Sequence, residues 1–213
     1  KKSLIKHHII PQNILEYPEK VNYTNLETGG NVYFVNYDMV QSEILLLAKG
    51  ELFNLNKMAA SMLFNTYFGR GLSSIVFQEI RESKSLAYSA FSSYNIASES
   101  EKPDYTMAYV GTQANKLEQA VKAMMELMSN MPEVEDQFSQ AKAATLKKIA
   151  SQRITKSNIF WRYESLKKRG INNDNRKQIY DEIKAMTMED LKTFFDDNIK
   201  NENYNIIVLG KKK

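Results

Sequence analysis

The order in which strand-like and helix-like patterns follow one another constrains the fold of this chain most strongly. Short runs rich in β-branched and aromatic residues alternate like strands, and longer segments have the apolar spacing typical of helices. Strands are predicted at 31–39, 41–50, 86–96, 104–113 and 204–210, and helices at 54–67, 74–84, 116–131, 134–153, 158–169, 175–185 and 188–199. This order predicts an α+β domain, in which a mostly antiparallel sheet packs against a layer of helices.

Local signals indicate how the first elements begin and end. The strands at 31–39 and 41–50 are joined by a short connection, which predicts a hairpin. Asn54 can cap the helix that follows, and the turn sequence GRGLSS places Ser73 or Ser74 at the start of the next helix. The residues expected to be buried on that second helix are Ile75, Val76 and Ile80.

Three further expectations concern the helical half. A methionine-rich face is expected to pack in the core, and its members are Met124, Met125, Met128 and Met131. Trp161 is expected to anchor the helical layer. Thr187, followed by Glu189 and Asp190, resembles a capping arrangement with acidic groups near the positive end of a helix.

The positions of prolines, glycines and possible linkers predict the domain organisation. Residues 1–30 have two prolines, few periodic positions and a Gly29–Gly30 turn, so we expect a leading segment or linker there. No repeat, low-complexity tract or internal linker divides the remainder. Residues 31–213 are therefore expected to form a single α+β domain.

Composition excludes several classes of function. The 29 basic and 25 acidic residues are interspersed, whereas a nucleic-acid-binding surface would be more concentrated, so no nucleic-acid partner is expected. No apolar run reaches the roughly 18 residues of a membrane span. The absence of cysteine excludes thiolate catalysis, iron–sulfur clusters and cysteine-based zinc sites.

Histidine chemistry is nearly absent as well. The two histidines are the adjacent pair His7 and His8, whose side chains point apart in an extended chain. Without another His or Cys, a zinc site would need carboxylates, so we expect a solvated or interface pair rather than a metal site. Serine nucleophiles lack a histidine base, and no G-x-S-x-G elbow is present. We therefore do not expect a free-standing catalyst.

Three stretches carry a resemblance to a known family. They are FGRGLSSIVFQEIRESKSLAYS, YVGTQANKLEQAV and YNIIVLG. Together they resemble the C-terminal, non-zinc domains of the M16 metallopeptidases, the insulinase, pitrilysin and mitochondrial processing peptidase group, in which a helix carries R-E-x-x-x-L-x-Y-S. The similarity covers roughly 32–210, and it implies a LuxS/M16 metallohydrolase-like fold.

The resemblance implies a division of labour between domains. M16 peptidases look like two or four copies of one α+β domain that close into a chamber, with a His-x-x-Glu-His zinc motif on an N-terminal domain. This sequence lacks that motif, so no cofactor is expected in this chain, and zinc is expected on a partner domain joined in cis or in trans. Arg81 and Tyr88 match the residues with which the family's C-terminal domain contacts the peptide substrate near its scissile bond. Family habit favours the periplasm or cell envelope of a bacterium.

Other interpretations remain open at this point. An Arg near a helix C-terminus also complements the helix dipole, and a Tyr in a strand is commonly a core residue with its hydroxyl at the rim. The domain could instead be a structural subunit, like the related core subunits of the cytochrome bc1 complex, or a peptide-binding module. If Arg81 and Tyr88 act together, they should lie on the same open side of the domain, within roughly 10 Å of each other.

Overall fold

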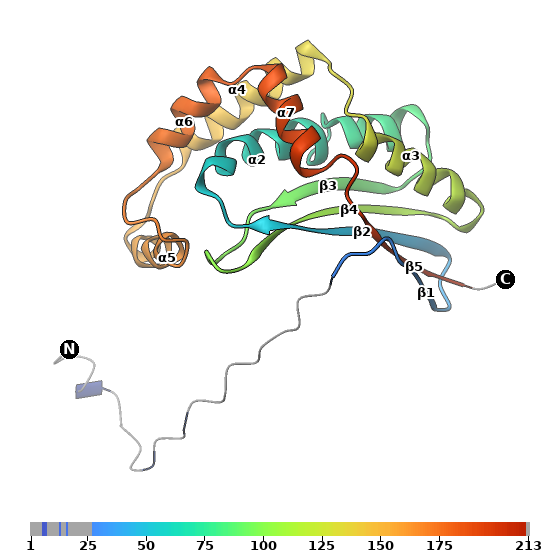
Figure 1. The fold of residues 1–213 in the computed structure, drawn as a ribbon, viewed down its shortest axis with the longest axis horizontal. Coiled ribbons are helices and arrows are strands. Elements are labelled where there is room, and N and C mark those ends of the chain that lie inside the picture. The colour runs from blue at the N-terminus through green and yellow to red at the C-terminus, as the bar shows by residue number, and fades with distance from the viewer. Residues whose placement is uncertain (1–5, 8–12, 14–15, 17–26, 212–213) are drawn as a thin grey trace.

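The sheet confirms the predicted α+β class. The computed structural model describes residues 6–7, 13, 16 and 27–211 (Figure 1). Within this part, one sheet has the strand order β1-β5-β2-β4-β3. Its strands are β1 (Val32–Asn36), β2 (Gln41–Leu52), β3 (Ser89–Asn95), β4 (Pro103–Gln113) and β5 (Asn205–Gly210). Only the β1–β5 pair is parallel, so the sheet is mostly antiparallel, as the sequence predicts.

The predicted hairpin between the first two strands is wrong. The C-terminal strand β5 lies between β1 and β2, and Val208 pairs with Phe34 on one side and with Ile44 on the other. Every residue of β1 is exposed, whereas every residue of β5 is buried or half-buried. An apolar strand with neighbours on both sides buries more surface than an edge strand, and this favours β5 in the inner position.

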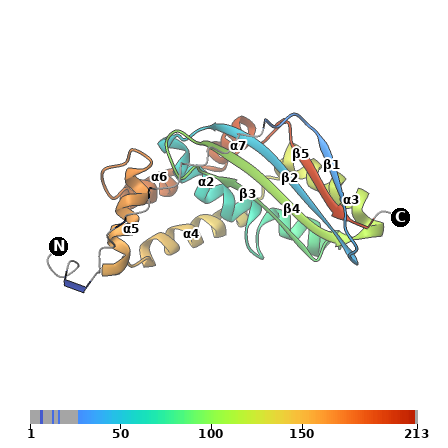
Figure 2. The same cartoon turned by 90° about the horizontal axis from the view of Figure 1, so that it is seen from below.

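Helices cover one face of this sheet. Helices α2, α3, α4, α6 and α7 lie over it, while α5 stands at the end of the layer (Figures 1 and 2). Their bounds are α2 (Met58–Phe64), α3 (Leu117–Ser129), α4 (Glu135–Ser151), α5 (Lys156–Lys167), α6 (Arg176–Ala185) and α7 (Met188–Asn198). Short 3₁₀ turns occur at η1 (Leu55–Lys57) and η4 (Ala114–Lys116), and π-helical turns at η2 (Asn65–Gly69) and η3 (Phe77–Ser83). Among the described residues, no helix has the length and apolarity to cross a membrane.

The core lies between the sheet and the helices. Alternate residues of β2 face it, and Ile44, Leu46 and Ala48 are almost fully buried. Aromatic rings from three helical segments meet above them, with Phe64 stacked on Phe68 at 5.0 Å and tilted against Phe194 at 5.6 Å. The methionine-rich face confirms its expected role, since Met124, Met128 and Met131 are buried and Met125 packs against the core.

The expectation that Trp161 anchors the helical layer is wrong. Its side chain is 69% exposed, because α5 contributes only Leu166 to the buried residues. Helical periodicity does not distinguish a helix within the layer from one at its end. Position in the fold therefore decides how far this helix is buried.

The capping roles predicted for Asn54 and Ser74 are confirmed, with one difference in the element that Asn54 caps. The side chain of Asn54 accepts a hydrogen bond from the Asn56 N–H, although it caps the short turn η1 ahead of α2. Ser74 begins the next helical segment, and its Oγ lies 3.4 Å from the Phe77 nitrogen, which donates to it. The residues predicted to be buried there, Ile75, Val76 and Ile80, are at most 2% exposed.

The residues just before β1 contact the sheet. The N–H groups of Gly29 and Asn31 both donate to Asn205 Oδ1, at 3.2 and 3.1 Å, and Thr28 Oγ1 accepts from the Lys49 N–H at 3.2 Å. The proposed division between a leading segment ending at residue 30 and a single following domain stays a prediction.

Replacing Thr187 with Ala is expected to lower the free energy of unfolding by about 1 kcal/mol, because α7 loses its capping box. Thr187 Oγ1 accepts from the Asp190 N–H at 3.2 Å, and Asp190 Oδ2 accepts from the Thr187 N–H at 2.8 Å. Thr155→Ala is the matched control, since Thr155 precedes α5 without a side-chain cap. Urea unfolding measures both variants, and an equal loss in both contradicts the capping argument.

Candidate active-site half

The turn after η3 determines where Arg81 and Tyr88 lie. The helical segment ends as predicted near Lys84, and Ser85 takes a left-handed conformation with a φ of 50°. The Leu86 N–H then donates to the Ile80 carbonyl at 2.9 Å, which closes the end of the helix. A left-handed residue is a common way to end a helix, although it is strained for a residue other than Gly. Arg81 therefore lies on the last turn before a sharp change of direction.

Three hydrogen bonds hold the following segment, two to the end of β4 and one to the turn η4 that follows it. Thr112 Oγ1 donates to the Leu86 carbonyl at 2.5 Å, and the Tyr88 N–H donates to the Gly111 carbonyl at 2.9 Å. Lys116 Nζ donates to the Ser85 carbonyl at 2.9 Å. Because the backbone of this segment is bonded to the sheet, the Tyr88 side chain leaves from a fixed position.

Arg81 keeps its guanidinium at the surface. Its Cζ lies 4.9 Å from the centre of the Phe77 ring, one turn earlier in the helix. Its Nε lies 3.7 Å from Glu82 Oε1, and the Arg81 side chain is 46% exposed. Glu82 thus forms a local ion pair with the neighbouring Arg81. Stacking on Phe77 orients the guanidinium while leaving donors open to a ligand.

The predicted strand at 86–96 contains Tyr88, but the observed strand β3 begins only at Ser89, so Tyr88 lies in the connection immediately before it. Tyr88 is 52% exposed. Its hydroxyl oxygen accepts a hydrogen bond from Gln113 Nε2 at 2.7 Å. A hydroxyl that accepts in this way still has its own proton to donate, and the accepted bond strengthens it as a donor. Tyr88 is therefore arranged as a hydrogen-bond donor facing solvent.

Arg81 and Tyr88 line one hollow of about 340 Å³. Gln113 and Lys116 line it as well, and the sequence analysis did not single these two residues out. They lie in the stretch YVGTQANKLEQAV, which carries part of the family resemblance, so that stretch was the signal for them. The hollow combines a guanidinium, a phenol, an amide and an ammonium group. Such a set of donors is suited to carbonyl or carboxylate oxygens.

The expectation that this chain holds no metal site can be compared only with the described residues. Among the residues that the structure describes, no group of three or more His, Cys, Asp or Glu side chains could hold a metal ion. His7 is exposed, and His8 lies outside the described residues. The donor set of the described hollow, with one carboxylate and two cations, does not suit a metal ion.

The fold defines the class of domain: an α+β domain whose sheet is covered by helices on one face (Figure 1). Sequence comparison identifies the family. The family model described as the peptidase M16 inactive domain matches residues 10–151. This chain therefore belongs to the M16 peptidase family, as its inactive, C-terminal domain.

Curated relatives agree with this family. An uncharacterized zinc protease of Rickettsia felis is 33% identical over 132 residues, which are 62% of this chain and 31% of the relative. A second uncharacterized zinc protease, from Rickettsia bellii, is 38% identical over 78 residues, covering 36% of this chain and 19% of the relative. The matched part of the chain thus spans about a third or less of these relatives.

Solved structures share the fold. A peptidase M16 inactive domain from Pseudomonas fluorescens superposes with a TM-score of 0.74 at 16% identity, covering 90% of this chain and 46% of that one. A protease from Helicobacter pylori superposes with a TM-score of 0.73 at 16% identity, covering 93% and 48%. The present chain corresponds to about half of each of these structures.

Proposed function

We propose that this chain is the non-zinc half of an M16-type zinc metalloendopeptidase. In this role it forms one wall of the peptide-binding chamber and supplies Arg81 and Tyr88 to a zinc site on an N-terminal domain, joined in cis or in trans. The observation that carries the proposal is the shared hollow, in which both residues present unused donors to solvent.

Tyr88 is assigned to the transition state. Its hydroxyl accepts from Gln113 and keeps its proton for the substrate carbonyl. As that carbonyl becomes tetrahedral, negative charge develops on its oxygen, and a fixed donor stabilises this charge more than it stabilises the planar substrate. The hydrogen bonds from Thr112 to the Leu86 carbonyl and from the Tyr88 N–H to the Gly111 carbonyl limit how far the donor can move.

Arg81 is assigned to substrate binding. A guanidinium can donate two parallel hydrogen bonds to a peptide carbonyl or carboxylate. Its contact with Phe77 orients the guanidinium, and its distance from Glu82 is long enough for a ligand to replace this ion pair. Arg81 would therefore position the peptide, while Tyr88 acts on the reacting carbonyl.

The uncovered face of the sheet supports the chamber role. Apolar side chains on this face are only half-buried, and Phe91 stacks on Tyr109 at 5.3 Å. Half-exposed apolar residues in an extended array can contact the side chains of a peptide. Zinc on the partner domain would supply the activated water.

The first test uses the chain alone and then adds the missing half. Alone, the chain is expected to retain no stoichiometric zinc after dialysis and to cleave no peptide when zinc is added. A zinc-bearing N-terminal domain should gain peptidase activity when this chain is supplied. One equivalent of tightly held zinc with turnover in the isolated chain contradicts the proposal. Full activity of the zinc domain without this chain favours a structural role instead.

A further inference from the structure

A second hollow lies beneath α5, away from Arg81 and Tyr88. It has a volume of about 440 Å³ and is bounded by α2, α4, α5 and α6. This volume is within the range of about 300–1,000 Å³ typical of pockets that hold small ligands. The apolar residues that line it include Met58, Met62, Ile149, Ile154, Leu166 and Ile179.

Two buried polar atoms of opposite kind belong to this hollow. Asn175 is 2% exposed, and its Oδ1 accepts no hydrogen bond from any residue in the described part of the chain. Arg162 Nε is buried and likewise donates to none of these residues. Buried polar atoms without partners cost roughly 1–3 kcal/mol each, so such atoms point to something that satisfies them.

The Oδ1 atom of Asn175 also makes no helix-capping hydrogen bond. Asn175 stands at the N-cap of α6, where an Asn side chain normally accepts from a backbone N–H of the first turn, yet it makes no such bond. Its Nδ2 instead lies 3.5 Å from Met58 Sδ. The amide nitrogen of Asn175 thus lies against Met58 of α2, and both residues line the hollow.

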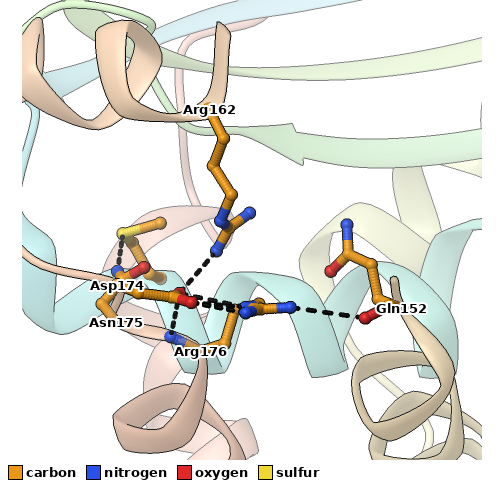
Figure 3. A network of polar contacts seen from close by, with 6 residues as sticks. Gln152, Arg162, Asp174, Asn175 and Arg176 are labelled. Atoms are coloured by element: carbon orange, nitrogen blue, oxygen red, sulfur yellow. Dashed lines mark hydrogen bonds and ion pairs between the residues drawn. The ribbon is translucent and has the colours of Figure 1, made fainter. Parts of the chain in front are cut away.

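A polar network holds Arg162 in place (Figure 3). Asp174 accepts from Arg162 Nη2 at 3.2 Å and from Arg176 Nε at 2.8 Å, and Arg176 Nη1 donates to the Gln152 carbonyl at 3.3 Å. The hydrogen bonds from Arg176, followed by the one from Arg162, hold the pKa of Asp174 below its usual range. The carboxylate thus remains charged at neutral pH, and α5 is tied to the start of α6.

The hollow carries an excess of positive charge. Arg153, Arg162, Arg169 and Arg176 all line it, and no Asp or Glu does so among the described residues. Asp174 pairs with two of these guanidinium groups, whereas Arg153 is exposed and has no ion pair within the described part of the chain. The surroundings therefore favour an anionic group.

We propose that this hollow binds the C-terminal apolar residue of a peptide. The apolar side chain would fill the space beside Met62 and Ile179, and the free α-carboxylate would accept from Arg162 Nε and Arg153. The backbone N–H of the same residue would donate to Asn175 Oδ1. This site goes beyond the proposed peptidase role and does not require it.

The three features together select this ligand class. An ordered water could satisfy Arg162 and Asn175, but it would leave the apolar lining and the charge of Arg153 unused. A fatty or aromatic acid would use the lining and the charge, but it has no N–H for Asn175. A C-terminal peptide residue uses all of them, because it joins an apolar side chain, a carboxylate and an amide donor.

Trp161 makes binding directly measurable, because it lines the hollow and is the only tryptophan in the chain. The probes are acetyl-Ala-Ala-Phe with a free carboxylate, the same peptide as its carboxamide, and 3-phenylpropionate. We expect the free acid to shift the Trp161 emission and to bind at least about tenfold more tightly than the carboxamide. Calorimetry supplies an independent dissociation constant.

Variants then separate the individual contacts. Arg153→Gln is expected to weaken binding of the free acid about tenfold, whereas Lys122→Gln, the same charge change on α3, should not. Asn175→Leu should weaken the peptide but leave 3-phenylpropionate unchanged, since only the peptide has an N–H. Thermal unfolding checks that each variant is folded, and the exposed Arg153 provides a test even if Asn175→Leu is unstable.

Three results overturn the proposal. Equal affinity for the free-acid peptide and its carboxamide would show that the site does not recognise the carboxylate. Equal affinity for the peptide and 3-phenylpropionate removes the role of Asn175 and identifies a general carboxylate pocket. Absence of binding by both methods at about 1 mM peptide leaves ordered water as the partner of Arg162 and Asn175.

Discussion

Replacing Tyr88 with Phe in the complete two-domain enzyme is expected to lower kcat by about 10²–10³-fold with little change in KM. The change keeps the ring and removes only the hydroxyl that accepts from Gln113 and faces the shared hollow. A donor used only as the carbonyl becomes tetrahedral affects the chemical step rather than substrate binding. Steady-state kinetics on a peptide substrate, with the zinc-bearing domain present, measures both constants.

Matched variants distinguish this role from a general loss of structure. Tyr105→Phe removes another exposed tyrosine hydroxyl, on β4 and outside the hollow, and should leave kcat unchanged. Arg81→Ala should raise KM, and Arg81→Lys should restore little, because a lysine lacks the planar pair of donors. Wild-type kinetics in the Tyr88 and Arg81 variants, at unchanged thermal stability, would leave this domain as a scaffold.

Replacing Gly69 with Ala is expected to lower the free energy of unfolding by about 3 kcal/mol or more. A Cβ on Gly69 would lie 2.0 Å from the Ser92 carbonyl oxygen, so either the π-helical turn η2 or the edge strand β3 must move. The same contact region includes Asn65, whose side-chain amide donates to the Tyr94 carbonyl and accepts from the Tyr94 N–H, both at 2.8 Å. The backbone of η2 therefore lies directly against the backbone of β3 at Gly69.

Gly29→Ala is the control for that experiment. A Cβ on Gly29 would meet its nearest neighbour, Asn31 Nδ2, at 3.4 Å, which is ordinary contact, and its effect should be within about 0.5 kcal/mol. Urea unfolding of both variants gives the comparison. A Gly69→Ala protein as stable as Gly29→Ala would mean that η2 can move away from β3 at little cost.

Much of the fold could be predicted because it depends on local patterns. Apolar periodicity gave the strand and helix positions, and the chemistry of Ser74 and Thr187 located two helix starts. The family motif singled out Arg81 and Tyr88, which line one hollow, while their contact with substrate stays a prediction. These successes share a cause, since a cap or an amphipathic face is determined by residues within a few positions of one another.

Contacts between distant residues could not be predicted in the same way. Nothing near 31–50 indicates that β5, more than 150 residues later, separates the first two strands. No local pattern around Gln113 indicates a role in the site, and its role becomes visible only in its hydrogen bond to the Tyr88 hydroxyl. The exposure of Trp161 depends on where α5 lies relative to the other helices, which its own sequence does not specify.

By itself, the sequence determined the α+β class, the family, and the two residues that the family motif carries, because each of these depends on composition, periodicity or a short string of residues. Only the tertiary structure decided the strand order, the close contact of Gly69 with β3, the donors around Tyr88 and the cationic hollow beneath α5. Each of these depends on groups far apart in the chain. Their positions follow from how the whole core packs rather than from any local preference.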